Sequence, residues 1–198
     1  MIVSVFDYGA GNLHSIAKAL EAGGATVRAC SDPVAALAAD ALVLPGVGAF
    51  AAAAERLAPG RERMRAALEA GLPCLGVCLG MQMLFDQSEE GPGAGLGLVP
   101  GRVTRLAASR VPQIGWNAIE AAGESLVTEA ALASAYYANS YVCRPADADT
   151  IVAWSEHEGD RFAAAVRRGA TIGVQFHPEK SSRAGLAFVR AWLASVSP

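Results

Sequence analysis

Residues 73–85 (PCLGVCLGMQMLF) constrain the fold most, because they join an apolar strand to an amphipathic run through a Gly-x-Cys-x-Gly turn. Gly76 and Gly80 flank Cys78 where side chains would clash as the strand and helix backbones pass each other. The turn holds the cysteine in a strained conformation with its side chain projecting. Helical amides after it favour the thiolate, and the Leu79 amide points to where an oxyanion would form. The pattern predicts a nucleophile elbow carrying sulfur, and a small buried core cysteine is the alternative.

Strand-like and helix-like runs alternate through the first half of the chain. Strands are predicted at 2–6, 25–30, 41–44 and 74–77, and helices at 13–22, 49–58 and 61–70. This alternation implies right-handed β–α–β crossovers and an α/β fold with a mainly parallel sheet. Glycine-rich loops at 8–12 and 45–48 and Cys78 all follow strands. They should therefore meet at the carboxyl edge of the sheet, where ligands bind.

Helices become rarer in the second half. Residues 88–101 are glycine-rich and form a loop, and short strands are predicted at 102–106, 114–119, 136–143, 149–155, 161–167 and 171–176 before an amphipathic helix at 182–196. No repeat or linker separates the two halves. We therefore expect one domain over residues 1–198.

Composition excludes several classes of function. The 198 residues are 53% hydrophobic with a net charge of −3, and the absence of a basic stripe argues against nucleic acid as a partner. The apolar runs are too short for a membrane span, and the N-terminal residues resemble a first strand rather than a signal peptide. Four scattered cysteines complete no zinc set, so no metal site is expected, and a reduced cytoplasmic protein is the simplest interpretation.

A cysteine nucleophile needs a base, and the chain has three histidines. His14 lies near the start of a predicted helix, and His157 lies in a polar turn. His177 instead ends an apolar strand and precedes Pro178, which stops the strand. Glu179 lies two residues further in an extended segment, so it can orient the imidazole while the other ring nitrogen faces Cys78. We therefore predict that His177 is the base.

Three separated motifs together carry a family resemblance. Residues 76–80 (GVCLG), 45–48 (PGVG) and 175–179 (QFHPE) resemble the class I, or triad, glutamine amidotransferases. Three further segments, DYGAGNL at the start, GWN in the middle and HPEKSS near the end, resemble the glutaminase subunits of imidazole glycerol phosphate synthase in histidine biosynthesis. The resemblance runs essentially from end to end. It implies an open, mainly parallel (mixed) sheet flanked by helices, in the flavodoxin-like three-layer architecture of that family.

The resemblance implies a catalytic triad. Cys78 would attack the carboxamide carbon of glutamine, His177 would carry the proton to the departing ammonia, and Glu179 would orient His177. A γ-glutamyl thioester would form and be hydrolysed to glutamate. No cofactor or metal is expected.

An oxyanion needs two donors. The amide of Leu79 is one, and the loop of Gly46, Val47 and Gly48 is expected to supply the other. Glycines on both sides of Val47 would let this peptide flip between productive and idle states. The alternative is that these glycines only permit close packing.

The resemblance also implies a pocket for free glutamine. Gln82 lies one helical turn after Cys78, and Ser140 and Tyr141 belong to a segment that completes the pocket. The sequence departs from the family at Asn139 and Gln113, where histidine is expected. Both residues keep hydrogen-bonding capacity and lose a titratable group.

The family pairs its glutaminase with a cyclase subunit, a (β/α)8 barrel that receives the ammonia and forms imidazole glycerol phosphate and AICAR. Expected contacts are Tyr8, Asn12, Trp116, Asn117 and Lys180, polar or aromatic residues on or near loops of the active edge. For Trp116, a core position at the centre of a strand is the alternative. Lys180 is one of only two lysines, and its ammonium suits a single carboxylate of a partner.

Three alternatives stay open. One is the glutaminase subunit of another pathway, such as pyridoxal phosphate or anthranilate synthesis, although the DYGAGN and GWN segments favour the histidine pathway. Another is a free-standing γ-glutamyl hydrolase, which would turn over without a partner. A non-catalytic interaction subunit would need a damaged triad, and the triad residues here are intact.

Overall fold

The computed structural model describes residues 1–9 and 13–197 and is built on one large twisted sheet. Its strands follow the order β2-β1-β3-β4-β13-β12-β11-β8. Their bounds are β1 Ile2–Phe6, β2 Thr26–Cys30, β3 Ala41–Leu44, β4 Cys74–Val77, β8 Glu120–Ala121, β11 Ile151–His157, β12 Asp160–Arg168 and β13 Thr171–Val174. The first five strands in that order are parallel, and β12, β11 and β8 continue the sheet with antiparallel pairs. The predicted open, mixed sheet of a flavodoxin-like fold is confirmed.

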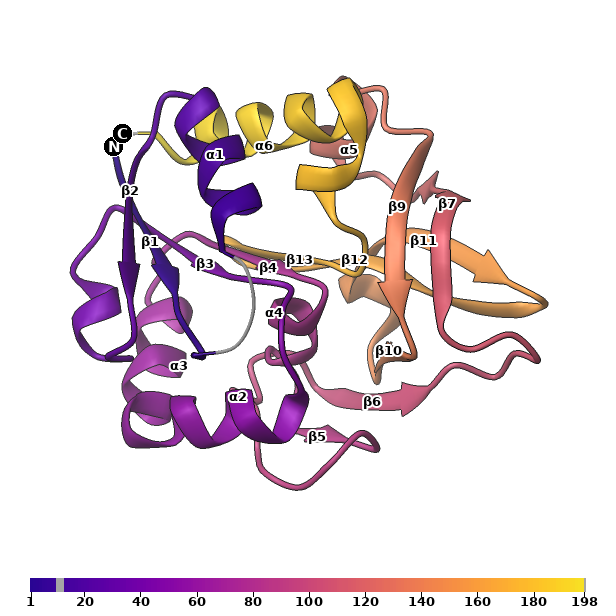
Figure 1. Cartoon of the computed structure of the whole chain (residues 1–198), viewed down its shortest axis with the longest axis horizontal. Coiled ribbons are helices and arrows are strands. Elements are labelled where there is room, and N and C mark those ends of the chain that lie inside the picture. Colours follow the sequence, from indigo (N-terminus) through magenta and orange to yellow (C-terminus); the bar gives the residue numbers. More distant parts are fainter. Residues whose placement is uncertain (10–12, 198) are drawn as a thin grey trace.

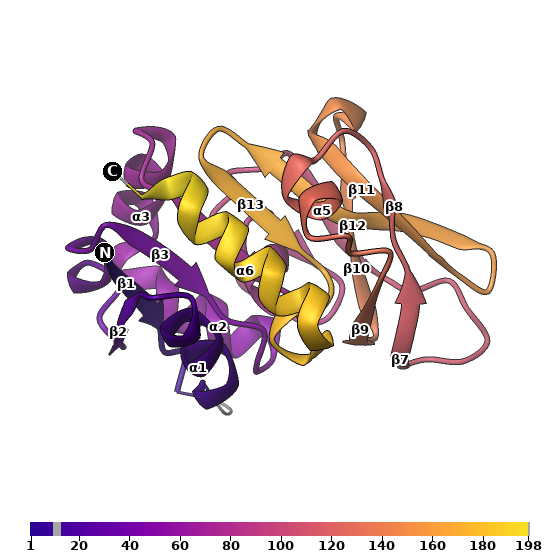
Figure 2. The same cartoon turned by 90° about the horizontal axis from the view of Figure 1, so that it is seen from above.

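Helices cover both faces of this sheet and make three layers (Figure 1). One face carries α1 His14–Ala22, α5 Ser125–Glu129 and α6 Ser182–Val196, and the other carries α2 Phe50–Leu57, α3 Arg61–Glu69 and α4 Leu79–Gln82. Seen from above, α6 runs obliquely along the sheet beside α1 (Figure 2). Among the described residues, no helix combines the length and the apolar character that crossing a membrane requires.

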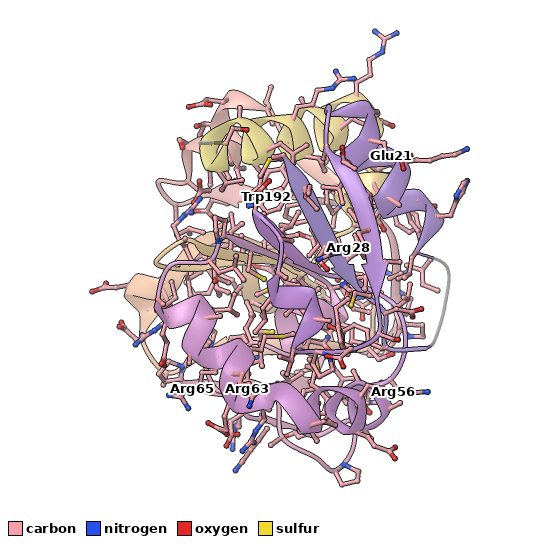
Figure 3. The ribbon with its side chains drawn as sticks, turned by 90° about the vertical axis from the view of Figure 1, so that its left-hand side faces the viewer. Glu21, Arg28, Arg56, Arg63, Arg65 and Trp192 are labelled. Atoms are coloured by element: carbon pink, nitrogen blue, oxygen red, sulfur yellow. The ribbon has the colours of Figure 1, made fainter. Side chains whose placement is uncertain are left out.

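The core is divided between the two faces because successive strand residues point to opposite sides. On β1, Val3 and Val5 pack under α1 and α6, whereas Phe6 packs toward α2 and α3. Trp192 of α6 is fully buried against the sheet, and in Figure 3 it points inward while Arg63 on α3 points away from the body of the molecule. Both faces of the parallel strands are therefore covered, as their continuous apolar runs require.

Two small sheets lie beside β11 and β12, at the end of the molecule away from the termini (Figure 1). One contains β5 Gln87–Ser88, β6 Gly101–Arg105 and β10 Tyr141–Pro145, and the other pairs β7 Gln113–Ala118 with β9 Ser134–Asn139. The predicted glycine-rich loop is thus bounded by β5 and β6.

The structure differs from the predicted elements in three places. The single strand predicted at 136–143 is two strands, which break at Ser140 and pair in different sheets. Helix α5 was not predicted, because five residues are too few to show a helical period. The helix after Cys78 is a single turn, after which the Phe85 amide donates to the Gln82 carbonyl in a tighter, three-residue step.

Candidate active site

Three neighbouring parallel strands end at one edge of the sheet and bring the site together. In the sheet register Leu44 of β3 lies opposite Gly76 of β4, and Val77 of β4 lies opposite Val174 of β13. The chain that leaves β3 enters the 46–48 loop, β4 ends at Cys78, and β13 leads to His177. Segments far apart in the sequence are adjacent for this reason, as expected for the carboxyl edge of such a sheet.

Cys78 occupies the strained turn that the Gly-x-Cys-x-Gly pattern predicts. Its φ of 47° and ψ of −103° are rare for a residue with a side chain. A methyl group at Gly80 would overlap the carbonyl oxygen of Leu44, so only glycine lets the elbow lie this close to β3. Cys78 is only 6% exposed, and it lines a cleft at this edge of the sheet. Since α4 is one turn long, the aligned helical amides near the sulfur are fewer than the sequence suggested.

His177 and Glu179 complete a triad arrangement with Cys78. Nδ1 of His177 lies 2.8 Å from Oε1 of Glu179, and the two side chains are only 4% and 8% exposed. The other ring nitrogen is left to hydrogen-bond the Cys78 sulfur. Burial opposes protonation of the imidazole, but its contacts with Cys78 and Glu179 outweigh burial and raise the pKa of His177 to about 10. The imidazole is therefore suited to hold a proton beside the sulfur.

The other two histidines have different surroundings. His14 opens α1, and His157 ends β11 with Nε2 3.0 Å from the carbonyl oxygen of Arg110. Neither lines the cleft of Cys78.

The loop after β3 lies against the triad. A methyl group at Gly46 would come within 2.9 Å of Cε1 of His177 and 3.0 Å of Cβ of Cys78. Gly48 has a φ of +109°, which favours glycine, and Val47 between them is half-buried. Gly46, Gly48 and Leu79 line one cleft with Cys78, so the amides of this loop and of Leu79 are the candidates for an oxyanion hole.

The cleft over Cys78 encloses about 200 Å³ and has a mainly polar lining. Gln82, Asn139, Ser140 and Tyr141 form one side of it. The Tyr141 carbonyl accepts hydrogen bonds from Nε2 of Gln82 at 3.2 Å and from Nδ2 of Asn139 at 3.1 Å. Gln82 is thereby held with its amide nitrogen on the backbone, so its oxygen is the atom available to a ligand.

Two site residues were not predicted from the sequence. Glu90 lines the cleft, where its Oε2 accepts from the Phe50 amide at 3.0 Å. No sequence signal distinguishes it from Glu89 in the same loop. Gln175 is fully buried and donates from Nε2 to the Cys78 sulfur at 3.5 Å. Its position in the QFHPE motif was the available signal.

The residues expected to meet a partner have different environments. Trp116 is 55% exposed on β7, so it is not a core residue, and the exposed Lys180 places Nζ 5.9 Å from the Tyr136 ring centroid. The Asn117 side chain donates to the Glu156 carbonyl at 2.7 Å. Tyr8 is 2% exposed and packs edge-on against the core residue Phe6, so it offers a partner almost no side-chain surface.

Asn12, another expected contact, lies outside the described residues. Within the described part of the chain, no three His, Cys, Asp or Glu side chains are grouped as a metal ion would need.

Comparisons with known proteins identify the family of the chain. A family model described as glutamine amidotransferase class-I matches residues 4–193. The chain is 44% identical over 206 residues to the imidazole glycerol phosphate synthase subunit HisH of Leifsonia xyli, with 98% of each chain covered. It is 48% identical over 192 residues to the same subunit of Thermus thermophilus, with 93% of each covered.

Solved structures share the fold. One entitled "Crystal structure of glutamine amidotransferase" superposes with a TM-score of 0.76 at 22% identity, and the PurLQS structure from Thermotoga maritima superposes at 0.72 with 19% identity. Each alignment covers 99% of both chains. The chain therefore belongs to the class-I glutamine amidotransferase family and, within it, to the family of HisH subunits of imidazole glycerol phosphate synthase.

Proposed function

We propose that the chain hydrolyses glutamine to glutamate and ammonia, and that a cyclase subunit uses the ammonia in histidine biosynthesis. The observation that carries the proposal is the elbow cysteine Cys78 facing His177, whose Nδ1 is held by Glu179 at 2.8 Å. The HisH relatives supply the pathway. An intact triad favours catalysis over a role as a passive interaction subunit.

The reaction proceeds through a thioester. The Cys78 sulfur attacks the carboxamide carbon of glutamine, and the electron pair of the C=O bond moves to oxygen. The Leu79 amide and an amide of the 46–48 loop stabilise this oxyanion. When the intermediate collapses, the C–N bond breaks and His177 gives its proton to the departing ammonia. Water then attacks the thioester carbon while His177 takes its proton, and breaking the C–S bond releases glutamate.

The cleft supports a binding site for free glutamine. Gln82, Ser140 and Tyr141 surround the space next to the sulfur and can hydrogen-bond the amino and carboxylate ends of the substrate. Glu90 adds a carboxylate for the substrate ammonium, because the Phe50 amide occupies only its Oε2. A cleft of about 200 Å³ suits one small amino acid.

The partner is a cyclase subunit with a (β/α)8 barrel that makes imidazole glycerol phosphate and AICAR. Support comes from the exposed apolar surface of β7, where Ile114 and Trp116 are 68% and 55% exposed. Lys180 lies beside Tyr136 and the triad, so it can pair with a carboxylate of this subunit.

We infer that the reaction takes place in the cytoplasm, because all four cysteines are free thiols. We also propose that residues 1–198 form one amidotransferase domain.

The test uses the chain together with its cyclase subunit. Mass spectrometry after treatment with an electrophilic glutamine analogue should find the label on Cys78, and a label on another cysteine would overturn the assignment. Cys78→Ala should abolish glutamine-dependent synthesis and leave ammonia-dependent synthesis intact. Equal glutaminase rates with and without the cyclase subunit would instead identify a free-standing γ-glutamyl hydrolase.

A further inference from the structure

Ser181 stands at the N-terminal end of α6, but its hydroxyl does not cap that helix. Serine is a favoured N-cap residue because its oxygen can accept from the amides of the first turn. Here the side chain makes no such bond, although the Ser181 carbonyl accepts from the Gly185 amide in the usual backbone pattern. The hydroxyl is therefore committed elsewhere, and Ser181 is only 1% exposed to solvent.

The hydroxyl connects two backbones that are distant in the sequence. Ser181 Oγ accepts from the Tyr136 amide at 2.9 Å and donates to the His177 carbonyl at 2.6 Å. A third bond runs directly between these backbones, from the His177 amide to the Tyr136 carbonyl at 2.8 Å. This one link therefore uses the backbone N–H and C=O groups of both His177 and Tyr136. Buried hydrogen bonds of this kind fix geometry, because leaving a partner unmet costs about 1–3 kcal/mol.

Strand β9, which carries Tyr136, also carries the wall of the cleft. It leads directly into Asn139, Ser140 and Tyr141, which line the space over the sulfur. β9 belongs to the two-stranded sheet with β7 and shares no ladder with the main sheet that carries Cys78. The position of His177 relative to this wall is therefore not set by the main sheet alone.

We propose that Ser181 is a positioning residue for the amidotransferase reaction, whose hydroxyl ties the backbone of His177 to β9 and so fixes the imidazole between the cleft wall and Cys78. The inference rests on the glutaminase activity proposed above. Ser181 touches neither the substrate nor the reacting atoms. It acts through His177, whose side chain must stay aligned with both Glu179 and the sulfur for proton transfer.

Losing the hydroxyl should affect turnover rather than substrate binding. The residues that hold glutamine lie on α4, the 88–91 loop and the β9–β10 turn, and Ser181→Ala leaves their own contacts in place. His177 moves protons and holds no part of the ground-state substrate. A displacement of about 1 Å can lower a rate by about 10²-fold, so a smaller shift of His177 is expected to lower kcat by about tenfold. KM should change by less than about twofold.

Ser155 supplies a matched control. It is another buried serine with two hydrogen bonds, one to the Ala118 carbonyl at 2.7 Å and one to the Tyr137 hydroxyl at 2.6 Å. It fastens the same β7–β9 sheet to β11 and touches no triad residue. Ser155→Ala therefore removes a comparable pair of bonds from the same sheet without touching the link to His177.

The experiment measures kcat and KM for glutamine with the wild type, Ser181→Ala and Ser155→Ala, each with its cyclase subunit, together with thermal midpoints. The expected result is a loss in kcat of about tenfold or more for Ser181→Ala alone, at unchanged KM. A wild-type kcat in Ser181→Ala, or equal losses in both variants, would overturn the proposal. If Ser181→Ala does not fold, Ser181→Gly, which also lacks the hydroxyl and is tolerated at an N-cap position, is measured instead. Lowered kcat at unchanged KM then supports the proposal, and wild-type kcat overturns it. A wild type that forms no glutamate would instead refute the proposed function itself.

Discussion

Gln113 and Asn139 lie directly opposite each other in the antiparallel pair of β7 and β9, and each buries an amide oxygen without a hydrogen-bond partner among the described residues. These are the two positions where the family resemblance leads us to expect histidine. Both departures therefore lie at a single cross-strand contact, where a change in the volume or protonation of one side chain alters the surroundings of the other.

Replacing Gln113 and replacing Asn139 should change the free energy of unfolding in opposite directions. Gln113→Met removes an unpartnered buried oxygen at similar volume and should raise the free energy of unfolding by about 1 kcal/mol. Asn139→Leu should lower it by about 1 kcal/mol, because Nδ2 of Asn139 donates to the Tyr141 carbonyl at 3.1 Å. Urea denaturation of both variants measures the two values. Shifts of the same sign would show that the two amides are equivalent.

Cys78→Gly should give a more stable but inactive protein. Glycine adopts a φ of 47° without strain, and relief of strain outweighs its larger backbone entropy. Cys78→Ala keeps a side chain in the strained conformation and serves as the control. We expect Cys78→Gly to exceed Cys78→Ala by about 1 kcal/mol in the free energy of unfolding. Equal stability in chemical denaturation would mean that the elbow stores no strain.

The triad should make stability depend on pH in a predictable direction. Cys78 and Glu179 raise the pKa of His177 from 6.5 to about 10 against the effect of burial, so the folded state favours the protonated imidazole. This contribution is complete below about pH 6.5 and is lost as pH rises to about 10. The difference in unfolding free energy between the wild type and His177→Gln, measured from about pH 6 to about pH 10, should shrink with rising pH. A growing difference would reverse the assigned sign.

Gly46→Ala should inactivate the glutaminase without unfolding the protein. The added methyl group would lie 2.9 Å from Cε1 of His177, so the imidazole must shift. We expect kcat to fall by about 10²-fold. Gly91→Ala, whose methyl would lie 3.3 Å from Cβ of Ala51, is the control and should stay within about threefold of wild-type kcat. Similar losses in the two variants would point to general loosening of the loops.

Trp116→Ala should weaken association with the cyclase subunit and leave the fold intact. The side chain is 55% exposed, so truncation removes little core packing, whereas aromatic anchors at interfaces contribute about 2 kcal/mol. The dissociation constant, measured by calorimetric titration, should rise about 30-fold. Ile2→Ala truncates another exposed apolar side chain, 44% exposed on β1, and should bind like the wild type. Unchanged affinity in Trp116→Ala would place the interface elsewhere.

The sequence by itself determined the elbow, the parallel half of the sheet and the choice of His177. These features are written locally. The glycines around Cys78 are needed for close approach of backbones, and the alternation of apolar strands with helices dictates parallel crossovers whose carboxyl ends meet at one edge.

Only the tertiary structure decided the remaining features. The break at Ser140, the burial of Tyr8 and the places of Glu90, Gln175 and Ser181 depend on partners distant along the chain. Ser181 shows the physical reason. Its local pattern predicts a helix cap, but a buried hydroxyl takes the partners that packing brings to it, and here packing brings the backbones of Tyr136 and His177.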